Sequence, residues 1–223
     1  FTLPKHNYMK FLHYLLITLF FSLNNTNIFS QKTQTQSCAT ETTEENRQFI
    51  EDNMDLIRYY ENEYYLLKES KSSTALTSIP VKIHIVTNDD GSGGIEINDV
   101  LSEFDEVNSY FQNSFVEFYI CDEVNYINSS SLYQFDTENQ QDLLYENHQS
   151  DILNVYFVDE IAFGEGYACG YTYLPGNSNQ YYDVVVMQNS CTTSNDNTTL
   201  THEMGHHLNL THTHGDTNGT LTD

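Results

Sequence analysis

A run of histidines near the end of this 223-residue chain constrains its fold more than any other feature. His202 and His206 are four residues apart, and on a helix this spacing stacks both imidazoles on one face. With about 100° per residue, three apolar residues fall on roughly the opposite face: Leu200, Met204 and Leu208. We therefore expect this helix to pack one side on the core and to present the two histidines in a cleft.

A third histidine can join the pair only if the helix ends before it. On a continued helix, His212 would lie about 100° around from His202 and His206. Asn209 is a suitable end point, because Asn is the non-glycine residue that best tolerates the left-handed backbone of a helix terminus. Three neutral imidazoles could then bind one Zn²⁺ ion and leave a fourth position for water, which is typical of a catalytic site.

Glu203 follows the first histidine and is placed to contact the metal-bound water rather than the metal. Zn²⁺ lowers the pKa of bound water and polarises a substrate carbonyl. A carboxylate within hydrogen-bonding reach can take the proton of this water and later deliver it to a leaving amine. The pattern therefore predicts hydrolysis with Glu203 as general base and acid. The alternative interpretation is a surface helix that is rich in histidine and has no catalytic role.

Three other histidines are not expected in this ligand set. His207 points away from the ligand face and His214 follows the last ligand, so both are expected at the surface or beside the site. His84 lies in a predicted strand and is expected to be structural.

The charge of the chain excludes some partners. Lys and Arg number 8 against 32 Asp and Glu, which gives a formal net charge of −24. Nucleic-acid phosphates and anionic membrane surfaces would be repelled. We interpret the acidity as a solvated surface.

The N-terminal residues have the pattern of a secretory signal peptide. Within residues 9–30, Lys10 precedes the apolar run 11–23, which is too short to span a bilayer. Residues 1–8 would then lie upstream of the true start. We expect a secreted protein that keeps no stable association with a membrane after signal removal.

Export would place four cysteines in an oxidising compartment, where pairing is the default. Three connectivities are open for the four residues, which are Cys38, Cys121, Cys169 and Cys191. At the other end, the chain stops at Asp223 without a terminating element, which indicates a fragment.

The remaining pattern alternates strands with helices. Apolar spacing predicts a helix from about 44 to 71, and a polar break at 70–74 predicts a linker that could also be a processing site. Strands are predicted at 80–87, 116–120, 153–158, 167–175 and 183–187. Helices are predicted over 97–112, with Asn98 as the cap, and from about 198. This order predicts an α/β or α+β class with a mixed sheet.

Residues 199–215 resemble the zinc signature of the metzincin metallopeptidases, and the pattern from His206 to Gly215 looks most like the pappalysin group, including the cytophagalysins and ulilysin. As an order of strands and helices, the resemblance extends over about 79–215. It implies an α+β fold: an N-terminal subdomain with a twisted five-stranded sheet, one antiparallel edge strand and the active-site helix. A methionine-containing turn and a C-terminal subdomain would lie beyond residue 223, so residues 79–223 would be an incomplete catalytic domain.

The resemblance also implies roles for individual residues. Glu203 would be the general base and acid, and the edge strand 167–174 would bind an extended peptide through main-chain hydrogen bonds. The zinc ligands would be His202, His206 and His212. The family usually has Gly at the position of Asn209, a departure that the left-handed preference of Asn makes tolerable.

Many metallopeptidases of this kind are made as zymogens, and some keep a pro-segment thiolate on the zinc. By this resemblance residues 31–78 would be a pro-segment and Cys38 its zymogen switch; a plain disulfide at Cys38 is the alternative. Cys169–Cys191 is the preferred bridge, tying the edge strand to the loop before the active-site helix, and Cys121 would then pair beyond residue 223. Structural Ca²⁺, frequent in the family, could use Asp216 and Asp223.

These inferences predict a secreted zinc metalloendopeptidase that cleaves protein or peptide substrates with one catalytic Zn²⁺. The alternative is a secreted binding module that retains the zinc geometry but is catalytically incomplete or inactive. A zinc hydrolase of a non-peptide bond is a third interpretation, against which the third histidine and the edge strand argue.

Overall fold

The computed structural model describes residues 38–40, 42–69, 76–136, 140–163, 166–176, 183–193 and 198–212. Several sequence predictions lie outside the described residues: the signal peptide at 9–30 with residues 1–8, the linker at 70–74, His214, and the calcium candidates Asp216 and Asp223. Within the described residues, no helix combines the length and the apolar character needed to cross a membrane.

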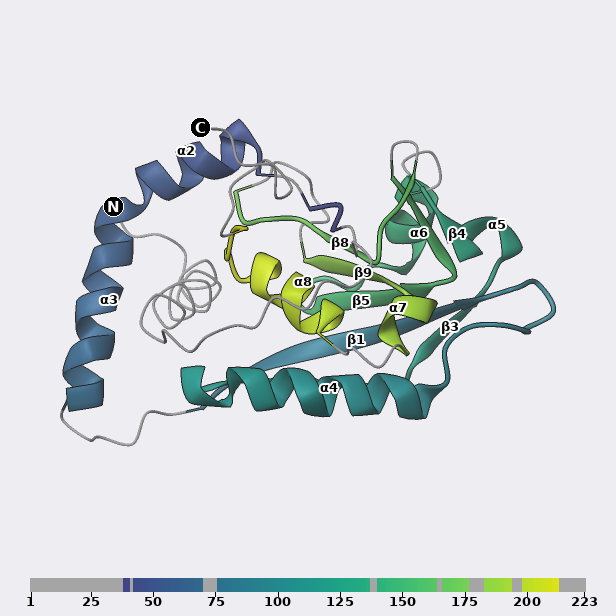
Figure 1. Ribbon diagram of the computed structural model, residues 1–223, viewed down its shortest axis with the longest axis horizontal. Coiled ribbons are helices and arrows are strands. Elements are labelled where there is room, and N and C mark those ends of the chain that lie inside the picture. The colour runs from purple at the N-terminus through teal and green to yellow at the C-terminus, as the bar shows by residue number, and fades with distance from the viewer. Residues whose placement is uncertain are drawn as a thin grey trace, which may run out of the picture.

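A mixed β-sheet forms the centre of the molecule (Figure 1). Its strands run in the order β2 (Val116–Ile120), β1 (Thr77–Thr87), β5 (Leu153–Val158), β9 (Val184–Gln188) and β8 (Gly170–Thr172). Neighbours pair in parallel except β8, which is antiparallel to β9. A sixth strand, β3 (Asn125–Asn128), pairs with β1 beyond the end of β2. The predicted five-stranded sheet with one antiparallel edge strand is therefore confirmed, with β3 sharing the position of β2.

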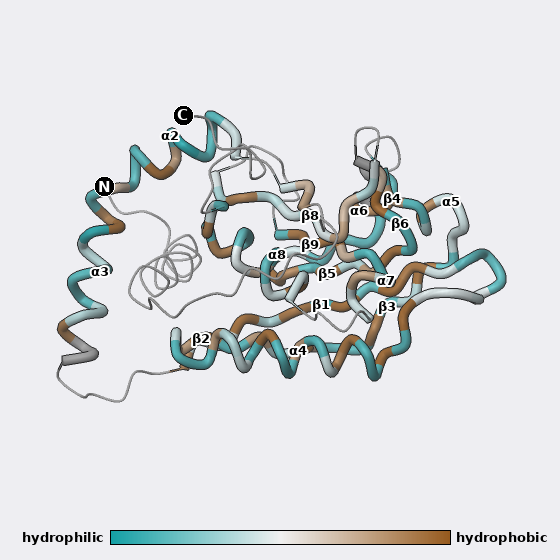
Figure 2. The backbone as a smooth tube through the Cα atoms, in the orientation of Figure 1, coloured by the Kyte–Doolittle hydropathy of each residue, from teal (hydrophilic) through white to brown (hydrophobic). Residues whose placement is uncertain are grey.

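The central strands are buried on both faces of the sheet. Successive side chains of a strand point to opposite sides, and all six residues of β5 are buried. In β5, Val155 and Phe157 belong to one apolar cluster and Tyr156 and Val158 to another. The first cluster is covered by two helices, α4 (Ile97–Phe111) and α8 (Thr199–His207). Figure 2 shows the apolar residues gathered along the strands and on the sheet side of α4.

The opposite face is covered by α6 (Gln140–Asn147) and a small three-stranded sheet. This small sheet consists of β4 (Gln134–Phe135), β6 (Glu160–Phe163) and β7 (Gly166–Tyr167). Short helical segments connect these layers: η1 (Gln112–Ser114), α5 (Ser130–Tyr133) and α7 (Asn189–Thr192). The packing of the central strands on both sides explains why they are nearly all apolar.

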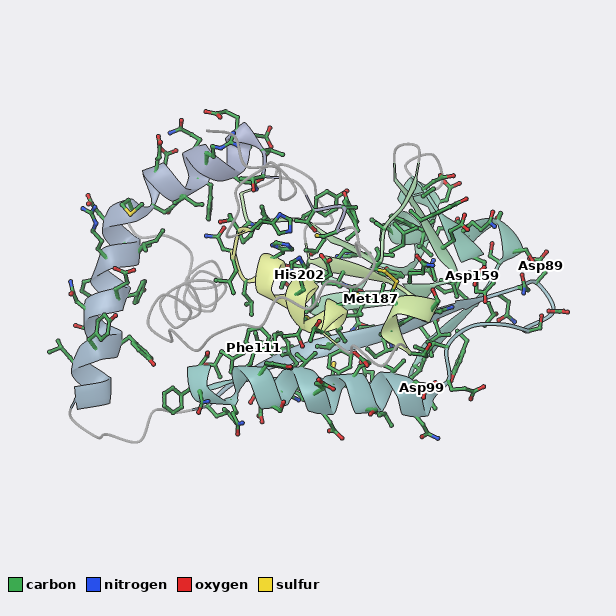
Figure 3. All side chains as sticks on the ribbon, viewed as in Figure 1. Asp89, Asp99, Phe111, Asp159, Met187 and His202 are labelled. Carbon is green, nitrogen blue, oxygen red and sulfur yellow. A yellow bond between two sulfur atoms is a disulfide. The ribbon has the colours of Figure 1, made fainter. Side chains whose placement is uncertain are left out.

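Asp89 and Asp99 are acidic residues on the outside of this layered core. Figure 3 shows Met187 and Phe111 inside the molecule, whereas Asp89 and Asp99 project from its rim. These positions agree with a solvated acidic surface.

The N-terminal helix expected over 44–71 is interrupted. It consists of α2 (Glu44–Asp52) and α3 (Met54–Glu69), which meet at Asn53. The Asn53 side chain donates a hydrogen bond to the Phe49 carbonyl at 2.7 Å, which offers the backbone an alternative to the helical ladder. The prediction of one continuous helix was therefore wrong.

Two further boundaries differ from the prediction. The helix α4 has Glu96 rather than Asn98 as its N-cap residue, and Glu96 makes no side-chain cap. Of the expected edge strand 167–174, only Gly170–Thr172 pairs with β9, because Tyr167 pairs with β6 in the small sheet.

The end of α8 is a left-handed turn, as predicted. Asn209 has a φ of 73°, and its N–H donates to the His206 carbonyl at 2.8 Å. The Leu210 N–H reaches back to the Gly205 carbonyl at 2.9 Å. These two bonds form a Schellman motif, which stops the helix and reverses the chain. The apolar stripe of this helix, Leu200, Met204 and Leu208, is buried in the core as expected.

The left-handed turn gives a test at Asn209. We expect Asn209→Ala to lower the free energy of unfolding by about 1–2 kcal/mol, because an L-residue with a larger left-handed penalty replaces Asn. Asn209→Gly should match or exceed the stability of the wild type. Urea denaturation of the three proteins measures this order, and equal stability of the Ala and Gly variants would contradict it.

A second test concerns Glu103, which is 2% exposed on the inner face of α4. Burial, aided by Glu106 and Asp99, raises its pKa from 4.5 to about 7. The folded protein thus retains a proton that the unfolded chain releases, so stability falls as pH rises from 4.5 toward 7. We expect Glu103→Gln to stabilise the protein by about 1–2 kcal/mol at pH ~8 but hardly at pH ~4.5. Thermal unfolding at both values checks this, and an equal gain at both would refute it.

Candidate metal and catalytic site

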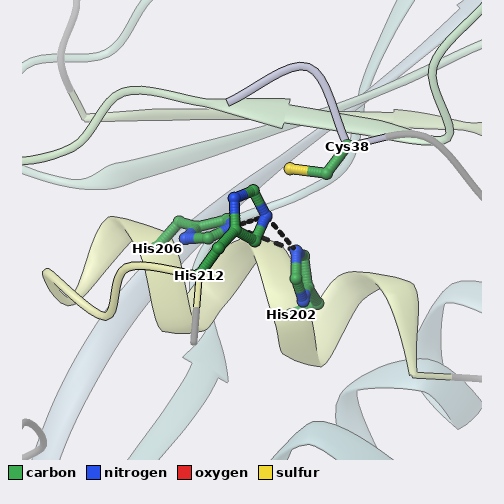
Figure 4. A group of neighbouring side chains, drawn as sticks. All are labelled: Cys38, His202, His206 and His212. Carbon is green, nitrogen blue, oxygen red and sulfur yellow. Dashed lines mark hydrogen bonds between the residues drawn. The ribbon is translucent and has the colours of Figure 1, made fainter. Parts of the chain in front are cut away.

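Three imidazoles converge at the end of α8. The Nε2 atom of His206 lies 2.9 Å from Nε2 of His202 and 3.1 Å from Nε2 of His212. The Nε2 atoms of His202 and His212 are 3.3 Å apart. Figure 4 shows the rings turned toward one another, with His202 and His206 on the helix and His212 on the chain that follows. The turn at Asn209 is what brings His212 back to the helix.

These three residues fit a metal ion. Ligand nitrogens at about 2.0–2.1 Å in a tetrahedral site lie about 3.3 Å from one another, close to the distances found here. The Nδ1 atom of His206 donates to the Leu210 carbonyl at 2.6 Å, which leaves the Nε2 lone pair of His206 directed at its neighbours. Burial, with His202 nearby, lowers the pKa of His206 to about 3 and keeps this ring neutral. A cation between the three rings would relieve the mutual repulsion of their lone pairs.

Cys38 completes a group of four candidate ligands. Its Sγ atom and one nitrogen from each of His202, His206 and His212 all lie within 4.8 Å of one another. The thiol is free, so the alternative of a disulfide at Cys38 is not what the structure has. Burial, with a contribution from the charge of Glu203, raises the pKa of Cys38 to about 12. Without a nearby cation this side chain is therefore a neutral thiol.

The segment that carries Cys38 runs along the edge strand β8. Cys38 forms a parallel bridge with Gly170, and the Ala39 N–H donates to the Gly170 carbonyl at 3.1 Å. Farther along, the Thr172 N–H donates to the Thr40 hydroxyl at 3.1 Å. The open main-chain groups of β8 are thus occupied by residues more than a hundred positions earlier in the sequence.

Glu203 is completely buried beneath this segment. Its Oε2 atom accepts a hydrogen bond from the Thr40 hydroxyl at 3.0 Å. Burial raises the pKa of Glu203 to about 7, and hydrogen bonds from Cys38 and Thr40 oppose the rise. The carboxyl group also packs on Gly170, where an added Cβ would lie 2.5 Å from Cγ of Glu203. Only glycine fits at this point of the strand.

Thr40 and Gly170 are the site residues that sequence reasoning missed. A glycine inside a predicted strand is a signal for close approach of another group, and Gly170 could have been found in this way. Thr40 carries no local signal, because its partner is 163 residues away in the chain.

The predicted disulfide is confirmed: Cys169, next to β8, is joined to Cys191 in α7. It links the edge strand to the helix that precedes α8. Cys121 is a free thiol at the end of β2 and lies outside the group of candidate ligands.

His207 and His84 lie outside the group of candidate ligands, as expected. His207 is buried on α8 and is absent from that group among the described residues. His84 is buried in β1, where its Nε2 donates to Asn154 and its Nδ1 accepts from Asn125, both at 3.0 Å. Its ring stacks on Tyr156, and burial lowers its pKa to about 4. These contacts make His84 structural.

Comparison with known proteins agrees with this geometry. Residues 136–222 match the profile of peptidase family M43, described as pregnancy-associated plasma protein-A. Among solved structures, a mutant of promirolysin from Tannerella forsythia is 19% identical with a TM-score of 0.50, covering 81% of this chain and 71% of that chain. Metalloproteinase-II from Bacteroides fragilis is 17% identical with a TM-score of 0.36, covering 60% of this chain and 43% of that chain. No curated protein matches.

The matched segment begins before α6 and ends beyond α8, and it contains Glu203 and all three converging histidines. The likeness to promirolysin supports the α+β fold with its antiparallel edge strand. The part of the chain that carries the site, residues 136–222, is thus similar to peptidase family M43.

Proposed function

We propose that this protein is a secreted zinc metalloendopeptidase that its own N-terminal segment keeps latent. The observation that carries the proposal is the convergence of three imidazole nitrogens within 3.3 Å of one another, beside a buried glutamate. The match of residues 136–222 to peptidase family M43 supports a peptidase, and the residues of this site supply the chemistry that such a peptidase needs.

His202, His206 and His212 would hold the zinc ion. When bound, Zn²⁺ would supply a Lewis acid for the scissile carbonyl and would lower the pKa of a water molecule. The Leu210 carbonyl fixes the ring of His206 through Nδ1 and thereby directs Nε2 to the metal. His202 is the exposed member of the three and faces the side from which a substrate would arrive.

Glu203 would act as general base and then as general acid. Its carboxylate takes the proton from the attacking water and returns it to the leaving amine. The close packing on Gly170 holds the carboxyl group next to the edge strand, where the scissile bond would lie.

A peptide substrate would bind as an added strand along β8. The Gly170 carbonyl and the Thr172 N–H face outward, where an added strand could bind them. In this structure they bind the Ala39 N–H and the Thr40 hydroxyl. A substrate can therefore bind only after the N-terminal segment has left. We propose the strand Gly170–Thr172 with its flanking residues, within 167–174, as the substrate-binding edge.

Cys38 would be the zymogen switch. Its thiol lies among the three histidines, and as a thiolate it would take the fourth position on the metal. Latency would end when residues 31–78 are removed. Secretion is supported by the disulfide between Cys169 and Cys191, since such bonds persist in oxidising compartments, and by the predicted signal peptide at 9–30.

The role of Glu203 can be tested directly. We expect Glu203→Gln, placed in a Cys38→Ala background, to reduce casein hydrolysis by about 10²–10⁴-fold, because the proton acceptor is lost. Zinc content should remain near one ion per chain, measured by atomic absorption. Glu96→Gln, at an exposed glutamate, is the matched control and should keep full activity. If the parent binds zinc but never cuts more than the Gln variant, the protein is a zinc-binding module rather than a peptidase.

The switch can be tested on the unprocessed protein. We expect Cys38→Ala to raise its initial rate on a peptide substrate by about tenfold or more, because loss of a strong zinc ligand weakens the binding of the N-terminal segment and lets it leave β8 more often. Cys121→Ala removes the other free thiol and should leave the rate unchanged. Equal rates for the wild type and Cys38→Ala would exclude Cys38 as the switch.

A further inference from the structure

The N-terminal segment has a second attachment to the body, made by Asn46. Asn46 is 1% exposed, and its Nδ2 atom donates to the carbonyls of Leu174 at 3.1 Å and Pro175 at 2.8 Å. Its Oδ1 atom accepts from the Thr43 N–H at 2.9 Å and the Thr43 hydroxyl at 2.7 Å. Every hydrogen-bonding end of this amide is therefore used, and the partners fix which end is nitrogen.

The Asn46 side chain has two structural roles. With Thr43 it forms the capping box that begins α2. With Leu174 and Pro175 it fastens that same helix end to the turn that follows β8. The structure of the helix terminus and its docking on the body are thus coupled.

The turn itself is shaped to receive the helix. Gly176 has a φ of +90°, and a Cβ added there would lie 2.4 Å from Cβ of Phe49. Phe49 lies one turn after Asn46 on α2, and its aromatic side chain packs directly on the backbone of Gly176. Any side chain at 176 would push the helix away.

The two attachments belong to one continuous stretch of chain. Ala39 and Thr40 bind β8 and Glu203, and Asn46 and Phe49 bind the turn directly after β8. Both attachments are non-covalent, and neither uses the metal ligands. The hydrogen-bond partners on the body are main-chain groups of residues 170–175 and the Glu203 carboxylate.

We propose that residues 38–52 form a self-contained inhibitory segment anchored by Asn46, and that this segment stays bound after the chain is cut in the predicted linker 70–74. The inhibitory role of the segment rests on the proposed function, whereas its binding to the body does not. A cut in the linker would leave Thr40 on Glu203 and the edge strand covered. Activation would then need a second cut within the segment, or its dissociation.

The experiment uses the full chain with a site-specific protease sequence in place of residues 70–74. Cys38→Ala and a chelator are included, so that retention cannot depend on a thiolate–metal bond. After cutting, size-exclusion chromatography at micromolar concentration separates bound from released N-terminal piece, and gel electrophoresis identifies both pieces. We expect the two pieces to elute together.

Asn46→Asp is the decisive variant. It preserves the Oδ1 acceptor for Thr43 but replaces the donor with an oxygen facing two carbonyl oxygens. We expect it to weaken association by about 100-fold, so that the pieces separate. Asn53→Asp makes the same chemical change where the amide donates only to Phe49 of its own helix, and it should keep the pieces together.

Release by Asn46→Asp could also result from a loss of helix α2 itself. Thr40→Val controls for this, because Thr40 precedes that helix and its substitution leaves the helix cap intact. It should also speed release, since the segment loses its bonds to Thr172 and Glu203. Separation of the cut parent protein, or co-elution of its Asn46→Asp form, would overturn the inference. The elution experiment uses no substrate, so a failure of the peptidase assay would not affect its result. A failure of the elution experiment would likewise not affect the peptidase assay.

Discussion

The site depends on the reversal of the chain at the end of α8. The left-handed residue Asn209 stops the helix, and two consequences follow within three residues. His212 is carried back toward His202 and His206, and the Leu210 carbonyl comes within 2.6 Å of His206 Nδ1. One backbone conformation therefore supplies both the third nitrogen and the hydrogen bond that orients the second.

The sheet supplies the other half of the arrangement. Strands β1, β5 and β9 lie inside the sheet, and β8 is the edge strand beside the site. An open edge invites an added strand, and here the chain supplies its own in residues 38–40. Gly170 allows Glu203 to reach this edge, so the proposed general base and the proposed peptide-binding strand are in contact. In the proposed mechanism, the absence of a side chain at Gly170 thus couples substrate binding to proton transfer.

Much of this could be predicted from the sequence because the relevant signals are local. The spacing of His202, His206 and Asn209 specifies a helix and its end, and apolar runs specify buried strands. The prediction failed where one side chain competes with the backbone, as Asn53 does in breaking the N-terminal helix. It also failed for contacts between distant residues, such as Thr40 with Glu203, because no periodicity records them.

The edge strand β8 is only three residues long, and so short a strand could slide along its neighbour. The bond between Cys169 and Cys191 closes a loop with a sequence separation of 22 and joins the start of this strand to the helix after β9. Slippage by one residue would turn Gly170 away and bring a tyrosine against Glu203. The disulfide therefore does more than add stability: it holds Gly170 in register with Glu203.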